Sequence, residues 1–201
     1  MNILNYKMEA PTMPQNDGPG GASAVESIGN NIYFYSEVSD SRILALNRAL
    51  KDMATRIQMD AVKSGVVAPI WLYIMSPGGS VFAGLSALDT IEEIRKKVPV
   101  YTVVDGYAAS AGTFISLAGS KRYIRPNSVM LIHQLSSVFW GKYEEMKDEI
   151  QNLDLLMSII VSIYEKRTSV PVKRLEQVLK KDLWWDAVKC KSMNLVDEIL
   201  E

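Results

Sequence analysis

Residues 70–94, IWLYIMSPGGSVFAGLSALDTIEEI, decide the fold class of this chain. The almost wholly apolar run at 70–75 predicts a short strand that is covered on both faces. SPGGS at 76–80 breaks the strand, and apolar residues at helical spacing return directly after it. A buried strand that passes straight into a helix is the building unit of parallel sheets with right-handed crossovers. The stretch therefore predicts an α/β domain.

The same alternation extends in both directions along the chain. We expect strands at 31–38 and 98–106, one or two more within 121–134 around an Arg125-Pro126-Asn127 turn, and helices at 39–65 and 108–119. For the first helix, Ser39 or Ser41 is a suitable N-cap and Gly65 a suitable stop. No internal repeat or second domain is visible.

Composition places the chain among ordinary globular proteins and limits its partners. It has 201 residues, 48% hydrophobic and 22% charged, with a net charge of −1, so no global basic field favours nucleic acid. The longest apolar run, 155–164, is about half a membrane span, and we expect no membrane partner. Cys190 is the single cysteine, which excludes an intrachain disulfide and fits the cytoplasm or an equivalent reducing compartment, such as an organelle stroma.

The N-terminal residues differ in composition from the rest. Residues 1–28 are rich in Pro, Gly and small polar side chains and cannot bury enough apolar surface to order themselves. We expect a flexible arm or processed leader there, followed by one domain at 29–201.

A long helix is predicted at about 142–166. Its apolar residues recur at steps of three and four: Met146, Ile150, Leu153, Met157, Ile160 and Tyr164. Such a helix spans roughly 37 Å, longer than a compact domain of this size needs. It is therefore expected to project into a partner, which suggests an oligomer.

Individually, the candidate chemical residues give weak signals. His133 is the only histidine and follows an apolar strand, where a structural role is common. Ser110 lies among small residues in GYAASAG, which can mark either an exposed nucleophile or tight helix packing. Asp182 either orients a histidine or is a charge at a helix end. Cys190 has no second candidate base and is read as inert.

Gly78 and Gly79 can present backbone N–H groups to a phosphate or an oxyanion. SPGGS lacks the lysine of a P-loop and the spacing of a dinucleotide fingerprint, so a nucleotide site is disfavoured. One histidine and one cysteine do not supply a dedicated zinc site, and we expect neither a metal nor a cofactor.

Taken together and in order, four segments resemble the Clp protease proteolytic subunit. They are IMSPGGSVFAGLSALDTI, GYAASAGTF, RPNSVMLIHQ and KDLWWDAVKCKSMNLVDEIL. The similarity runs from about Asn31 to Leu200 and implies a crotonase-like α/β fold, a βαβ spiral with a projecting handle helix at about 142–166. It also implies a serine endopeptidase.

The resemblance assigns roles to individual residues. Ser110 would be the nucleophile, His133 its base and Asp182 the carboxylate that orients the imidazole. The N–H groups of Gly79 and Ala111 would form the oxyanion hole. Substrate would lie as an added strand beside 76–81 and 134–140, where the substrate-binding residues are Gly78, Ser80, Val81, Gln134 and Leu135.

The resemblance further implies an assembly: a homo-oligomer of heptameric rings stacked in pairs through the handle helix, a tetradecamer that takes peptides and unfolded proteins. An AAA+ unfoldase would feed it. The N-terminal arm lacks the family's gate and docking sequence, which leaves unfoldase docking uncertain. Leu135 stands where the family usually has Pro, and Ala111 where it usually has Met. Such divergence suits a viral or organellar relative.

Three alternatives remain open at this stage. The chain is a catalytically silent subunit that assembles with another proteolytic subunit, a crotonase-type acyl-thioester enzyme, or a Ser-Lys peptidase in which Lys121 replaces His133. Whether Ser110 and His133 lie within hydrogen-bond reach discriminates the acyl-thioester enzyme, and turnover of a short peptide by the purified homo-oligomer discriminates the silent subunit.

Overall fold

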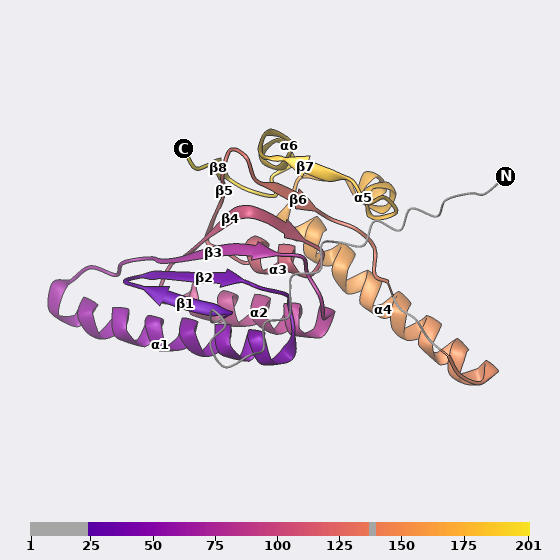
Figure 1. The fold of residues 1–201 in the computed structure, drawn as a ribbon, viewed down its shortest axis with the longest axis horizontal. Helices are drawn as coiled ribbons and strands as arrows, with labels where there is room; N and C mark the ends of the chain where they lie inside the picture. The colour runs from indigo at the N-terminus through magenta and orange to yellow at the C-terminus, as the bar shows by residue number, and fades with distance from the viewer. Residues whose placement is uncertain (1–23, 137–139) are drawn as a thin grey trace.

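The computed structural model describes residues 24–136 and 140–201. Within them the chain forms one sheet and the helices that cover it (Figure 1). The strands are β1 Val25–Ile28, β2 Asn31–Tyr35, β3 Ile70–Ser76, β4 Val100–Ala109, β5 Lys121–Ile124, β6 Val129–Leu131, β7 Trp184–Asp186 and β8 Glu198–Ile199. The helices are α1 Asp40–Ser64, α2 Val81–Ile94, α3 Gly112–Leu117, α4 Tyr143–Arg167, α5 Val172–Leu179 and α6 Ala187–Ser192.

The sheet order is β1-β2-β3-β4-β5-β8, and β6 and β7 continue from β4 off this path. Strands β2, β3, β4 and β5 are mutually parallel, because α1, α2 and α3 carry the chain back between them. The predicted α/β class is confirmed. The long strand β4 changes partner along its length: Tyr101–Val104 pair with β5, and Tyr107–Ala109 pair with β6.

One face of the sheet packs on the helices. Ile32, Phe34, Leu72 and Ile74 are fully buried and belong to the main core, together with apolar residues of α1 and α2. The alternate residues of β3 are only half-buried, so the prediction that this strand is covered on both faces is wrong for the single chain. Trp71 lies there in an aromatic group, stacked on Tyr123 with ring centres 5.4 Å apart.

Helix α1 begins and ends close to the predicted residues. Ser39 is its N-cap, although no side-chain bond forms there, and Gly65 ends it in the left-handed conformation at φ 71°. Glycine adopts that conformation without the steric cost of a Cβ atom, which explains the stop. The helix expected at 108–119 is shorter: β4 runs on to Ala109, and α3 covers only Gly112–Leu117.

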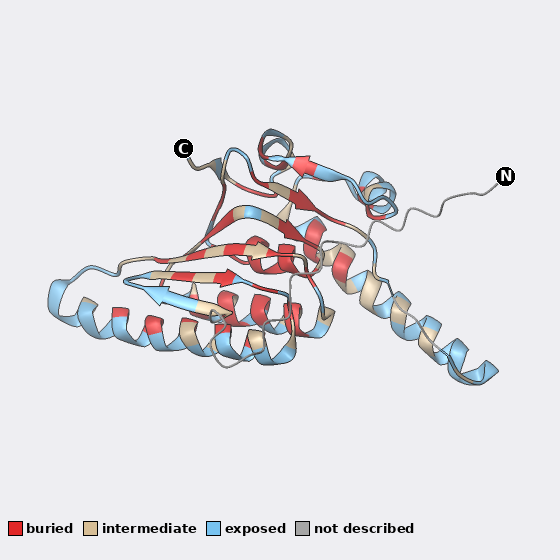
Figure 2. Cartoon of the chain, viewed as in Figure 1, coloured by how far each residue is buried: buried red, intermediate tan, exposed pale blue. Residues whose placement is uncertain are grey.

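Helix α4 is the long helix expected at 142–166, and its observed bounds differ by one residue at each end. Its C-terminal part joins the core through Ile160, Ile163 and Tyr164. The N-terminal part extends away from the sheet, and its turns are mostly exposed (Figures 1 and 2). Met146, Ile150 and Leu155 are among the exposed apolar side chains of that part.

The N-terminal boundary differs from the prediction. Strand β1, at Val25–Ile28, falls inside the segment expected to be an arm, and it pairs antiparallel with β2 across a turn at Gly29. Tertiary pairing outweighs the weak local β signal there. The remainder of the predicted arm, residues 1–23, lies outside the described residues. Among the helices of 24–136 and 140–201, none is both long enough and apolar enough to span a bilayer.

Candidate active site

Ser110 occupies the turn between β4 and α3. Its φ of 51° lies in the left-handed region, a conformation that costs a residue with a Cβ atom about 1–3 kcal/mol of free energy. The surrounding bonds hold it there: its N–H donates to the Leu131 carbonyl at 2.9 Å, and its carbonyl accepts from the Thr113 N–H at 2.9 Å. A serine on a sharp strand-to-helix turn is typical of an exposed nucleophile.

The two glycines that follow β3 lie against this turn. Gly78 has φ 92°, and a Cβ atom there would stand 2.6 Å from the Ser110 Cβ. Gly79 has φ 140°, and a Cβ there would stand 2.3 Å from the Val38 carbonyl oxygen. Only glycine permits this backbone conformation together with so close an approach. The glycine pair therefore brings bare backbone to the serine.

Two backbone donors beside Ser110 have no partner among the described residues. Gly79 forms a bridge with Val38, but the bridge uses the carbonyl of Gly78 and the N–H of Ser80. Across residues 24–136 and 140–201, neither the N–H of Gly79 nor that of Ala111 donates to a protein acceptor. These are the two donors expected to form the oxyanion hole. Both N–H groups are therefore available to bind an oxyanion, and their role as the oxyanion hole stays a prediction.

Strand pairing brings His133 to Asp182. Strands β6 and β7 are antiparallel with Leu131 opposite Trp184, so the same register continued by two residues sets His133 opposite Asp182. The imidazole Nδ1 lies 3.3 Å from the Asp182 Oδ1. The His133 side chain is 25% exposed and that of Asp182 is 76% exposed. An Nδ1–carboxylate contact is the arrangement that fixes the imidazole tautomer with Nε2 free to accept a proton.

A second pairing brings His133 to Ser110. Strands β4 and β6 are parallel with Ala109 opposite Leu131, so the serine and the histidine follow neighbouring strand ends. Both line one small pocket, together with Gly79, Val81, Phe114, Gln134, Leu135, Ser136, Ile160 and Tyr164. No hydrogen bond joins Ser110 to His133 among the described residues. Catalytic hydrogen bonds are often long without substrate and tighten only in the complex.

Lys121 is placed far from this pocket. It pairs with Tyr101 near the start of β4, whereas Ser110 follows the last residue of that strand. Its ammonium contacts Glu198 at 3.4 Å and lies over the Tyr123 ring. The Ser-Lys alternative is therefore wrong, because the lysine and the serine stand at opposite ends of β4.

The predicted substrate-binding residues divide into two groups. Val81, Gln134 and Leu135 line the pocket. Gly78 and Ser80 do not: the former packs against Ser110, and the latter caps α2, its Oγ accepting from the Ala83 N–H at 3.2 Å. Residues 137–139 of the second predicted substrate segment lie outside the described residues. No observation tests where a peptide would bind.

Several pocket residues were not singled out from the sequence. Phe114 comes from α3, and Ile160 and Tyr164 come from the buried end of α4. The sequence places Ile160 and Tyr164 on the apolar stripe expected to face a partner, whereas the structure buries both within the chain. A periodic pattern predicts that a face is buried, but it does not predict which other element that face meets.

The remaining candidates carry no chemistry in this structure. Cys190 is fully buried, and burial raises the pKa of its thiol to about 12, which is unfavourable for a thiolate nucleophile. No group of three His, Cys, Asp or Glu side chains that suits a metal occurs in 24–136 or 140–201.

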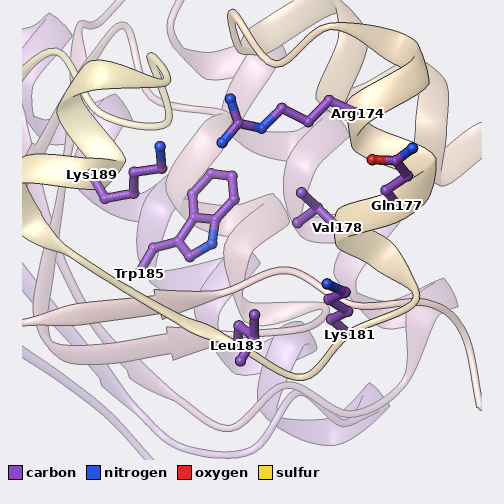
Figure 3. Close-up of a pocket in the computed structure, with 7 residues that line it drawn as sticks. All are labelled: Arg174, Gln177, Val178, Lys181, Leu183, Trp185 and Lys189. Carbon is purple, nitrogen blue, oxygen red and sulfur yellow. The ribbon is translucent and has the colours of Figure 1, made fainter.

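A second cavity, of about 230 Å³, is lined by residues of α5, by Lys181 and Leu183 on either side of Asp182 in the sequence, and by Trp185 (Figure 3). Arg174, Lys181 and Lys189 surround its Trp185 wall. It contains none of the predicted site residues.

An α/β domain in which a serine, a histidine and a carboxylate lie at neighbouring strand ends has the organisation of a serine hydrolase. The family model for Clp protease matches residues 27–201, and the chain belongs to this family. Two relatives are similar over most of both chains. ATP-dependent Clp protease proteolytic subunit 3 of Streptomyces avermitilis is 33% identical over 171 residues, 83% of this chain and 77% of the relative. ATP-dependent Clp protease proteolytic subunit 1 of Streptomyces coelicolor is 31% identical over 186 residues, 89% of this chain and 84% of the relative.

Membership confirms the predicted resemblance to Clp proteolytic subunits and, with it, the crotonase-like α/β fold. It also makes the chain a member of a peptidase family and removes support for an acyl-thioester enzyme. The roles of individual residues are not fixed by membership, and they remain predictions that rest on geometry.

Proposed function

We propose that the chain is a serine endopeptidase in which Ser110 attacks the scissile carbonyl carbon. The observation that supports the proposal is that His133 lines the same pocket as Ser110 and has its Nδ1 3.3 Å from the Asp182 carboxylate. His133 Nε2 takes the proton of the serine hydroxyl as the acyl bond forms. It then returns that proton to the leaving amine, and Asp182 holds the imidazole throughout.

The backbone N–H groups of Gly79 and Ala111 donate hydrogen bonds to the oxyanion of the tetrahedral intermediate. Both N–H groups lie beside Ser110 and have no protein acceptor among the described residues. A preorganised donor of this kind is worth roughly 3–4 kcal/mol of transition-state stabilisation. The substrate backbone would lie extended along the segment after β3, with one side chain entering the pocket lined by Val81, Phe114, Leu135 and Ile160.

We propose further that the working form is a closed oligomer of paired heptameric rings in a reducing compartment, fed by an AAA+ unfoldase. The apolar side chains left exposed on α4 support an assembly. An open serine site would digest its host, and a chamber restricts access to it. The unfoldase partnership rests on family membership alone.

A second candidate has one observation in its favour. Ser110 and His133 share no hydrogen bond among the described residues, and Asp182 is largely exposed, so the isolated chain holds its triad loosely. A silent subunit that assembles with another proteolytic subunit would show such a site. It would give no turnover of a short fluorogenic peptide as a purified homo-oligomer, only in a mixture with its partner.

The experiment is labelling with a fluorophosphonate probe, followed by peptide mapping. Modification is expected at Ser110 and should disappear in Ser110→Ala and His133→Ala. Ser64→Ala is the control, because Ser64 lies at the C-terminal end of α1 and has no role in the proposal. Labelling that persists in Ser110→Ala would contradict the assignment of the nucleophile.

A further inference from the structure

Helix α4 reaches the nucleophile turn through two buried hydroxyl groups. Thr113 Oγ1 lies 2.6 Å from the Ser110 carbonyl oxygen, to which it donates. The same Oγ1 lies 2.6 Å from the Tyr164 hydroxyl oxygen. Thr113 is fully buried and Tyr164 is 1% exposed, so water does not substitute for either contact.

The direction of these bonds follows from counting protons. A threonine hydroxyl has one proton, and here that proton is donated to Ser110. The Tyr164 hydroxyl must therefore be the donor to Thr113 Oγ1. Burial raises the pKa of Tyr164 well above its ordinary value, which keeps this phenol protonated at working pH. The two hydrogen bonds therefore form one oriented chain, from Tyr164 through Thr113 to the Ser110 carbonyl, in which each bond polarises the next.

This chain of hydrogen bonds ends on a strained residue. Ser110 keeps its positive φ only because its neighbours hold it, and its carbonyl accepts both the N–H and the hydroxyl of Thr113. Without the hydroxyl bond the carbonyl keeps one donor instead of two. The serine backbone then has more freedom to rotate, and its Oγ moves with it.

Tyr164 belongs to α4, so its contact with Thr113 joins that helix to the nucleophile turn. The residue lies near the C-terminal end of α4, and its ring packs edge-on against Phe114 with centres 6.0 Å apart. Tyr164 and Ile160 also line the Ser110 pocket. The position of α4 and the position of the nucleophile turn are thus set by shared contacts.

We propose that Thr113 and Tyr164 are positioning residues of the peptidase, which hold the backbone of Ser110 in its attacking conformation from helix α4. This inference rests on the proposed function, because it requires Ser110 to be the nucleophile. A purely structural pair would contribute to folding and leave the chemical step of folded molecules unchanged.

The variants are chosen to remove hydroxyl groups while keeping shape. Thr113→Val is nearly isosteric and lacks the donor, Thr113→Ser keeps the donor and loses a methyl group, and Tyr164→Phe keeps the ring. We expect Thr113→Val to lower kcat for a short fluorogenic peptide about tenfold with little change in KM, a loss of the size of one hydrogen bond. Thr113→Ser should stay within about twofold of the unchanged chain, and Tyr164→Phe should fall between the two.

The rate of fluorophosphonate labelling at Ser110 should follow kcat in the same order. Because the two residues act in series, Thr113→Val combined with Tyr164→Phe should be no slower than Thr113→Val alone. Reductions that multiply would overturn the series. Melting temperature and particle mass identify any loss that comes from unfolding, and if Thr113→Val does not fold, Tyr164→Phe and Thr113→Ser carry the test.

The outcomes separate this inference from the function on which it rests. Labelling of Ser110 that is lost in Ser110→Ala supports the function. If Ser110 labels and turns over at the unchanged rate in Thr113→Val and Tyr164→Phe, the positioning role is wrong and the function stands. If the probe modifies another residue in the unchanged chain, both are wrong.

Discussion

At the scale of single residues, the site depends on how closely two backbone turns approach each other. Ser110 and Gly78 come from the ends of neighbouring strands, and the Gly78 position leaves no room for a Cβ beside the serine. Gly112 is similarly close to Ser76 on the other side, where a Cβ would lie 3.0 Å from the Ser76 Cβ. The small residues around Ser110 are thus explained by contact between the two strand ends.

Replacing Gly78 by alanine should lower activity on the order of a hundredfold. The new methyl group would lie 2.6 Å from the Ser110 Cβ and would also force an alanine to φ 92°, so both turns must move apart. A displacement of about 1 Å at a reacting group costs on the order of a hundredfold in rate. Peptide turnover and fluorophosphonate labelling measure the effect.

Gly29→Ala is the matched control for this substitution. Gly29 also has a positive φ, 59°, but no heavy atom lies within 4 Å of its Cβ position, and it occupies the turn between β1 and β2. This variant should lose about 1–2 kcal/mol of stability and keep its activity. Equal turnover in the two variants would contradict the close-approach argument.

The sequence singles out the polar candidates of the site but not the residues that pack around them. Ser110, His133 and Asp182 stand out because they are chemically distinctive and occur in the order of a known family. Thr113 and Tyr164 carry no such signal, since a threonine in a small-residue helix and a tyrosine on an apolar stripe both read as packing. Their contact joins elements 51 positions apart, and only the fold reveals it.

At the scale of elements, the contacts of α4 with the rest of the described residues are concentrated at its C-terminal end. Near its C-terminus, Arg167 pairs with Glu92 of α2, and the Arg167 carbonyl accepts from Arg122 of β5. The turns before Leu155 make no comparable contact with the sheet, and Figure 2 shows them exposed. The free half of α4 is therefore the surface on which we expect a second copy to pack.

Ile150→Asp tests that expectation. Ile150 is 58% exposed in the single chain, so the substitution should change the stability of the monomer by no more than about 0.5 kcal/mol. In an assembly it would bury an unpaired charge, which costs several kcal/mol per site. Native particle mass and peptidase activity should fall together.

Gln151→Asp supplies the control for Ile150→Asp, because Gln151 is the next residue of α4, is exposed and lies off the apolar stripe. It should keep both mass and activity. An Ile150→Asp variant that retains the unchanged particle mass would show that this stripe is not the interface.

A second element-level contact predicts a pH dependence of stability. Asp197, just before β8, accepts from the Arg122 backbone N–H at 2.8 Å and from its guanidinium. Burial alone would raise the pKa of Asp197, but the hydrogen bonds and charge of Arg122 outweigh it and lower the pKa below 3.8. A lowered carboxyl pKa stabilises the fold above about pH 4, and this contribution is lost as pH falls through the folded-state value.

Asp197→Asn should therefore be less stable than the unchanged chain at pH 7, and the difference should shrink toward pH 2–3. Urea unfolding at several pH values measures it. Glu198→Gln is the control, since the neighbouring carboxylate makes an exposed pair with Lys121 and should leave the acid dependence almost intact. A constant difference between Asp197→Asn and the unchanged chain across this range would contradict the assignment.

At the scale of the whole molecule, the order of strands and helices was predictable, and the path of the sheet was not. Strand β4 reads as one buried run, yet it pairs with β5 along its first half and β6 along its second. Gly106 lies between these two halves with a φ of 99°, and the register with β3 shifts at the same place, so the backbone of β4 is irregular there. A glycine within a strand marks such an irregularity, but it does not predict which strand pairs next, because strand pairing is a long-range choice. The antiparallel strand β7 depends on this change of partner, and so does the meeting of His133 with Asp182.

The size and shape of the site predict which substrates the intact particle accepts. In the proposed binding mode a peptide lies extended along the segment after β3, and a folded domain of 100 residues, with a radius of gyration of about 13 Å, does not present its backbone in that form. Purified particles should therefore cleave a short peptide and a permanently unfolded protein without nucleotide. They should spare the same protein when it is folded, unless an AAA+ unfoldase and ATP are added. Ser110→Ala, assayed in parallel, excludes a contaminating peptidase. Cleavage of the folded and the unfolded protein at equal rates would contradict restricted access, because the difference arises only if substrates must reach Ser110 as extended chains.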